Sequence, residues 1–181
     1  ATYGSDSKEP KEKHILFIIE ALRGSNKDCT PAQMLEYIYD RLTNNLNNWA
    51  VTSKIYVLFH LLLRDQELGK KCSVTLTKKN SIMKSYQLKA GDTSYEKKMY
   101  YDLGLLYTNY IVTMTKGKRH VKLMTCKQAD IHKVIAETST PDMFEAYEVM
   151  DKLVGIAFEF FKHQMFCKKT RLYAYITKLI F

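Results

Sequence analysis

The side chains of this sequence best suited to chemistry are the cations of a short stretch that leads into an apolar run. Lys11, Lys13 and His14 follow Pro10 directly, and Lys8 lies just upstream. Ammonium and protonated imidazole groups bind phosphate oxygens through short, charge-assisted hydrogen bonds. The chemistry that these residues could perform is therefore the capture of a multiply charged anion.

A helix must position these cations. Apolar residues recur at helical spacing directly after them, and Gly24 is a natural stop, so a helix should begin within a residue or two of Pro10: the stripe is Ile15, Ile18, Ile19 and Leu22. The start of a helix presents free N–H groups and the positive end of the dipole, which together favour bound anions. A solvated basic cap, paired with Glu9 and Glu12, is the alternative interpretation.

Size and composition limit the class of protein. The chain has 181 residues, 46% of them hydrophobic, which suits one well-buried core. Its formal charge of +9 indicates an anionic partner: a nucleic acid, an acidic membrane surface or an acidic protein.

The cysteines and histidines indicate neither metal binding nor catalysis. The four cysteines are widely spaced without a C-x-x-C pair, so we expect reduced, apolar thiols and no metal or other cofactor: Cys29, Cys72, Cys126 and Cys167. His60 lies among leucines and phenylalanine and is expected to be a hydrogen-bonded core residue. The other histidines form no recognisable triad or metal motif, and no glycine-rich phosphate loop or nucleophile elbow is present, so we predict that the protein is not an enzyme: His120, His132 and His163. The longest apolar run, Ile55–Leu63, is too short to cross a bilayer.

The remaining elements are predicted to be helical. Thr30, Pro31 and Gln33 form a capping box that should open a second helix, which buries Leu35, Ile38 and Leu42. A third helix is expected over Trp49–Leu68, with Gly69 as its stop, Trp49 as a packing anchor and an apolar middle at the centre of the fold. Residues 70–89 are predicted to be a loop with a short helix.

The second half of the chain continues in the same way. Thr93 and Glu96 form a further capping box, ahead of a helix that ends at Gly117, and Val121–Glu137 is predicted to be another helix. Thr140 and Pro141 open a helix whose large apolar residues are expected to face the core: Phe144, Tyr147, Val154, Phe158 and Phe161. The last helix, from Thr170 to Phe181, has no stop signal, so the domain is expected to be truncated at its C-terminus.

These patterns predict an all-α fold of seven or eight helices packed antiparallel to their neighbours, as a bundle or a right-handed solenoid. Residues 1–9 are expected to be a flexible lead-in, and residues 10–181 a single domain.

Three stretches together resemble the ANTH domain, the membrane-binding module of clathrin adaptors. Pro10–His14 resembles the family's Lys-x-Lys/Arg-His/Tyr signature, and Trp49–Lys54 with His60–Asp65 is similar to its Trp, Lys and His-x-Leu-x-Arg run. Ala157–Tyr175, continuing to Phe181, is similar to a later helix pair of the family. The family signature also has a lysine further upstream, at a position that falls here at Ala1, so that Lys8 is the nearest substitute.

The resemblance implies a phosphoinositide-binding adaptor domain that recruits clathrin-coat machinery to membranes in endocytosis or vesicle trafficking. Lys11, Lys13, His14 and Lys8 would contact a headgroup such as that of phosphatidylinositol 4,5-bisphosphate. Helical spacing places Lys13 away from Lys11 and His14, so the three converge only if Lys11 lies before or in the first turn. The implied location is cytoplasmic and peripheral, on the plasma membrane or on clathrin-coated pits and vesicles. Clathrin and adaptor proteins would bind through a region outside this sequence, and some relatives carry a SNARE as cargo.

A basic nucleic-acid-binding module is the alternative. It rests on the charge of +9 and on 13 tyrosines, since exposed aromatic rings can stack on bases. The dense basic run Lys116–Lys122 could contact a second lipid or a nucleic acid, although cations at a helix end are also locally favourable. The sequence contains no helix-turn-helix, RRM or KH signature.

Overall fold

The computed structural model describes residues 8–25, 29–65, 67–78, 83, 86–88, 91–117, 128–166 and 170–181. Within this part of the chain all regular structure is helical, which confirms the predicted all-α fold of seven or eight helices. The elements are α1 (Glu12–Leu22), α2 (Pro31–Thr43), α3 (Trp49–Arg64), α4 (Leu68–Lys78), α5 (Tyr95–Gly117), the 3-10 turn η3 (Gln128–Asp130), α7 (Ile131–Ala136), α8 (Thr140–Phe166) and α9 (Arg171–Ile180).

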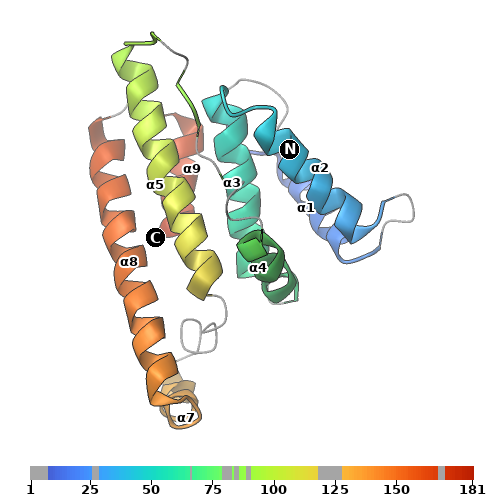
Figure 1. Ribbon diagram of the computed structural model, residues 1–181, viewed down its shortest axis with the longest axis vertical. Coiled ribbons are helices and arrows are strands. Elements are labelled where there is room, and N and C mark those ends of the chain that lie inside the picture. Colours follow the sequence, from blue (N-terminus) through green and yellow to red (C-terminus); the bar gives the residue numbers. More distant parts are fainter. Residues whose placement is uncertain are drawn as a thin grey trace.

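The helices are arranged around α3 (Figure 1). The pair α1 and α2 lies on one edge of the molecule and α8 on the opposite edge, with α3 and α5 between them. The C-terminal helix α9 packs against both α3 and α8, so the end of the chain returns to its centre.

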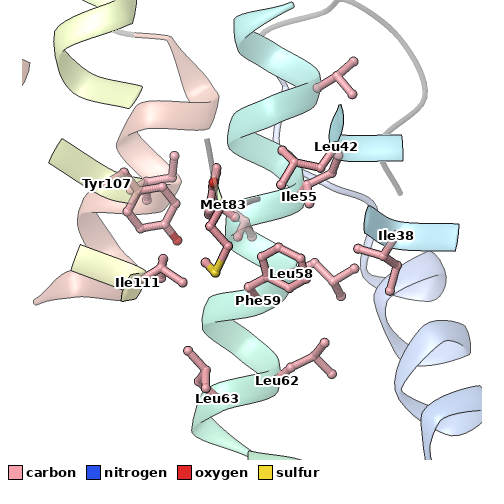
Figure 2. Close-up of a cluster of buried hydrophobic side chains, with 14 of the residues drawn as sticks. Ile38, Leu42, Ile55, Leu58, Phe59, Leu62, Leu63, Met83, Tyr107 and Ile111 are labelled. Carbon is pink, nitrogen blue, oxygen red and sulfur yellow. The ribbon is translucent and has the colours of Figure 1, made fainter. Parts of the chain in front are cut away.

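The core of the fold is the nearly all-apolar helix α3. Figure 2 shows Ile38 and Leu42 of α2 on one side of α3, and Tyr107 and Ile111 of α5 on the other. A helix that is apolar on every face must be surrounded in this way, because any exposed face would leave hydrocarbon in water. The predicted centre of the fold is confirmed.

Aromatic stacking fixes the start of α3. The indole of Trp49 stacks on Tyr100 of α5 with 4.1 Å between ring centroids, and on Tyr173 of α9 at 5.5 Å. The predicted packing role of Trp49 is confirmed, because its ring joins three helices that are distant in the sequence.

Several helix boundaries follow the local signals. The Thr30 hydroxyl accepts a hydrogen bond from the backbone amide of Gln33, and Oε1 of Gln33 accepts one from the backbone amide of Thr30, which completes the predicted capping box. Gly24, after α1, has a φ of +83°, a conformation that glycine adopts without a steric cost. Helix α5 ends at Gly117, as predicted.

The boundary between α3 and α4 differs from the prediction. Helix α3 stops at Arg64, four residues before the expected end, and Gly69 lies inside α4. The break is caused by Asp65, whose carboxylate accepts hydrogen bonds from the amides of Glu67 and Leu68 and so caps the next helix. Residues 70–78 belong to the stretch 70–89 that we predicted to be a loop with a short helix, and they are helical throughout.

Some predictions fall outside the described residues. They include most of the basic run 116–122, the first part of the helix expected over 121–137, and two of the four cysteines, Cys126 and Cys167. Of the other two cysteines, Cys72 is buried and Cys29 is half-buried.

The largest correction concerns α8. The helix begins at Thr140 as predicted, but its core-facing side chains are Ala146, Leu153, Ala157 and Phe160. The residues that we expected in the core are exposed instead: Phe144, Tyr147, Val154, Phe158 and Phe161. Helix α8 carries apolar side chains on two faces, and α5 covers only one of them.

Candidate anion-binding cleft

The start of α1 places the predicted cations at the rim of a cleft. Lys11 is the residue immediately before the helix, with an extended backbone (φ −68°, ψ 126°), and no side chain caps the first turn. Lys11 therefore lies before the first turn, which is the condition stated above for the three cations to converge.

The cleft has a volume of about 950 Å³, at the upper end of the range for small-molecule sites. Basic residues from two helices and from the segment before α1 line it: Lys8, Lys11 and His14 from the N-terminal part, and Lys54 and Arg64 from α3. Lys54 and Arg64 were not among the site residues predicted from the sequence.

Helix α3 forms the inner wall of the cleft. Lys54, in its second turn, lines the cleft although only 2% of its surface is exposed. Arg64, in its last turn, donates a hydrogen bond from Nη1 to the carbonyl oxygen of Leu179 at 3.2 Å. This bond ties one side of the cleft to α9, which also contributes Tyr175.

Three carboxylates balance part of the positive charge. Glu9, Glu12 and Asp65 line the cleft, and Asp65 is engaged by Arg23, whose Nη2 lies 2.8 Å from Asp65 Oδ2. None of the ion pairs identified in the described part of the chain involves Lys8, Lys11, Lys13 or His14. Their charges remain available to an incoming anion.

Positive charge surrounds His14. The positive charge of the chain's amino terminus, followed by partial desolvation and then by Lys13 and Lys11, lowers the pKa of His14 below its usual value. An anion bound among these groups would reverse that shift, because opposite charge stabilises imidazolium. Burial, with the charges of Glu12 and Glu9, raises the pKa of Tyr175, so its phenol stays protonated and can donate a hydrogen bond in the cleft.

Three of the four predicted site residues come together here. Lys8, Lys11 and His14 line the cleft, whereas Lys13 is exposed outside its lining, as helical spacing indicated. The adjoining surface of α1 is apolar, since Leu16 and Phe17 expose 51% and 54% of their areas. Leu16 itself lines the cleft.

His60 has a structural role. His60 Nδ1 and the Tyr107 hydroxyl share a buried hydrogen bond of 3.0 Å, which confirms the predicted core histidine. Burial, with a smaller effect of Arg64, lowers the pKa of His60 to about 4.

The described residues contain no group of three or more side chains arranged to hold a metal ion. Among the same residues, no helix is long and apolar enough to cross a membrane.

No protein-family model, curated protein or solved structure matches this chain. The fold and the cleft together define the class of protein: an all-α domain with a mixed-charge, mainly basic cleft beside the N-terminus of its first helix.

Proposed function

We propose that this domain binds the phosphorylated headgroup of a phosphoinositide, such as phosphatidylinositol 4,5-bisphosphate, at the surface of a membrane. The observation that carries the proposal is the convergence of basic residues from separate elements on one cleft: Lys8, Lys11 and His14 beside Lys54 and Arg64 of α3. Phosphate groups favour such a site, because cations and helix-terminal amides both stabilise their charge.

The surface next to the cleft supports a lipid rather than a free inositol phosphate. Leu16 and Phe17 stand exposed on α1, two and three residues after His14. Apolar side chains beside a basic site can enter the headgroup layer while the cations bind phosphates, as in other peripheral membrane proteins. A free phosphate compound would gain nothing from them.

The proposed role is that of an adaptor. Each basic residue near an anionic leaflet contributes about 1 kcal/mol, so a cleft with this number of cations gives only weak attachment by itself. Coincident binding of coat proteins would supply the rest. The resemblance of Pro10–His14 and of Trp49–Asp65 to the ANTH domain supports clathrin-coat machinery as that partner and coated membranes as the location.

Vesicle co-sedimentation tests the proposal. We expect binding to vesicles that contain phosphatidylinositol 4,5-bisphosphate to exceed binding to phosphatidylserine vesicles of equal charge. Lys11→Glu should weaken the first by about tenfold or more, since a reversal removes one attraction and adds one repulsion. Lys133→Glu on α7, an equal charge change at an exposed site outside the cleft lining, is the matched control and should have little effect.

An RNA-binding measurement on the same variants separates the alternative. If RNA binds more tightly than the vesicles, and Lys133→Glu weakens RNA binding as much as Lys11→Glu does, the protein is a basic nucleic-acid-binding module and the lipid proposal is wrong.

A further inference from the structure

The outward face of α8 carries a continuous apolar stripe. Six large side chains form it, each with between 41% and 69% of its area exposed: Phe144, Tyr147, Val154, Phe158, Phe161 and Met165. Their spacings alternate between three and four residues once Asp151 is included as the single polar member. This is the heptad pattern of a helix that packs lengthwise against another helix.

The stripe is separate from the core face of the same helix. Leu153 and Phe160, on the other side of α8, are buried, and α5 is the main neighbour of the helix. Toward its C-terminal end the stripe meets Phe181, the residue that follows α9, where the rings of Phe161 and Phe181 pack edge to face with 5.9 Å between centroids. An exposed apolar surface of this length is unusual in a monomer and marks a contact surface.

We propose that this stripe is the contact surface of a homodimer, in which the α8 helices of two copies pack antiparallel around Gly155. Glu148 and Lys162 lie seven residues before and seven residues after Gly155, so all three share one flank of the stripe. When two copies cross antiparallel at Gly155, Glu148 of each copy faces Lys162 of the other. A parallel pair would leave both charges without opposite partners across the seam.

The centre of the proposed contact is open to close approach. Gly155 lies exposed on α8, and a side chain at this position would meet no neighbouring atom within 4 Å. Two helices that meet at a glycine can bring their backbones close together. Val154 beside it would then pack against Phe158 of the second copy. Asp151, at the polar position of the stripe, would also lie near Lys162 of that copy and fix the register.

The area of the stripe suits a stable dimer. A large apolar or aromatic side chain has 150–250 Å² to bury, so about 100 Å² remains exposed on each residue at these exposures. The stripe of one copy then offers about 600 Å², and two copies bury about 1,200 Å² before any polar rim is added, which reaches the lower limit of standard protein interfaces.

This inference does not depend on the proposed lipid site, because the stripe lies on α8 and the cleft is formed by α1, α3 and α9. If both proposals hold, one dimer carries two clefts, and the second headgroup binds at a high effective concentration.

Sedimentation equilibrium of the purified chain, at concentrations up to about 200 µM, tests the dimer. We expect a mass of twice the 21.1 kDa of one chain. Val154→Glu should weaken association by about 30-fold or more, since it places a charge at the centre of the apolar seam. Tyr37→Glu, at an equally exposed apolar residue on α2, is the matched control and should remain dimeric. Circular dichroism verifies that both variants fold.

A charge exchange identifies the antiparallel register. Glu148→Lys and Lys162→Glu should each weaken the dimer, and the double variant should restore it, because the exchanged charges again face each other between copies. A wild-type chain that stays monomeric over this concentration range overturns the proposal, even if α8 captures an amphipathic helix of another protein. A dimer that persists in folded Val154→Glu, or one that the double variant fails to restore, overturns it as well.

Discussion

Arg23 Nη2 lies 2.8 Å from Asp65 Oδ2 and joins the end of α1 to the start of α4. The other carboxylate oxygen, Oδ1, accepts hydrogen bonds from the amides of Leu68 at 2.8 Å and Glu67 at 2.9 Å. One side chain therefore caps α4 and holds α1, the helix that begins at the cleft, against the end of α3.

Asp65→Ala should lower the free energy of unfolding by about 1–2 kcal/mol at pH 7, because it removes the cap and the ion pair together. Asp65→Asn keeps a side-chain oxygen that can cap the helix, so it should lower the free energy of unfolding by less than Asp65→Ala does. Urea denaturation of the three proteins measures both differences. Equal losses for Ala and Asn would contradict the capping role.

The effect of Asp65 should depend on pH. Burial alone would raise its pKa, but the Leu68 and Glu67 amides and Arg23 outweigh burial and lower the pKa below its ordinary value. A carboxylate with a lowered pKa in the folded state contributes stability above the unfolded pKa of about 3.9 and loses it as the pH falls through the folded value. The difference between wild type and Asp65→Ala should therefore shrink below about pH 4.

Protonation of His60 should give the free energy of unfolding a second pH dependence, in a different pH range. Its pKa is about 4 in the folded state because of burial, against about 6.5 when unfolded, so protons bind preferentially to the unfolded chain. Stability from this residue is complete above about pH 6.5 and should fall by up to about 3 kcal/mol as the pH drops toward 4.

Two variants separate this effect from other titrations. His60→Asn removes the ionising group, and its stability should fall less steeply than that of the wild type between pH 6.5 and 4, as followed by the fluorescence of the single tryptophan, Trp49. Tyr107→Phe breaks the hydrogen bond, which should cost about 1–3 kcal/mol at pH 7 while leaving the steep pH slope in place. A wild-type slope in His60→Asn would refute this account.

His14 should couple headgroup binding to proton uptake. Surrounding positive charge, with that of the amino terminus first, lowers the pKa of His14, and a bound phosphate would raise it. Binding to phosphoinositide vesicles should therefore strengthen as the pH falls from about 7 to 5.5, the range in which imidazole titrates. The phosphate also titrates near this range, so His14→Ala is the reference. If the pH dependence of this variant equals that of the wild type, His14 does not contact the phosphate.

Phe17 should contribute to vesicle binding but not to binding of the soluble headgroup. Phe17→Ser removes an exposed apolar side chain worth about 1.5–3 kcal/mol when fully buried, so vesicle binding should weaken by about tenfold. Calorimetric titration with inositol 1,4,5-trisphosphate should give an unchanged affinity. Tyr37→Ser, an exposed aromatic residue outside the cleft lining on α2, is the control for a general loss of apolar surface. An equal loss in both assays would mean that Phe17 supports the cleft itself and does not enter the membrane.

Local sequence signals predicted much of the helical framework. Signals that act over a few residues can be recognised directly in the sequence. They include the capping box at Thr30 and Gln33 and the glycines at 24 and 117. The break at Asp65 was missed because no glycine or proline marks it. The available signal was an aspartate three residues ahead of an apolar helical residue, Leu68.

Only part of the candidate site could be predicted from the sequence. Lys8, Lys11 and His14 are neighbours along the chain, and their types alone predicted an anion site. Lys54 and Arg64 are 40 or more residues away, and they join the cleft only because α3 packs beside the start of α1. A lysine within an otherwise apolar helix was the one local indication that Lys54 has a special place.

The all-α class, the central place of α3 and the basic start of α1 could be predicted from the sequence, because periodicity, capping and charge are properties of neighbouring residues. Which face of α8 is buried, and which cations share a cleft, depends on how the helices pack. Helix α8 has two apolar faces, and burial of either face would agree with the helical spacing of its apolar residues. The choice between them depends on α5, whose position comes from packing between residues far apart in the chain.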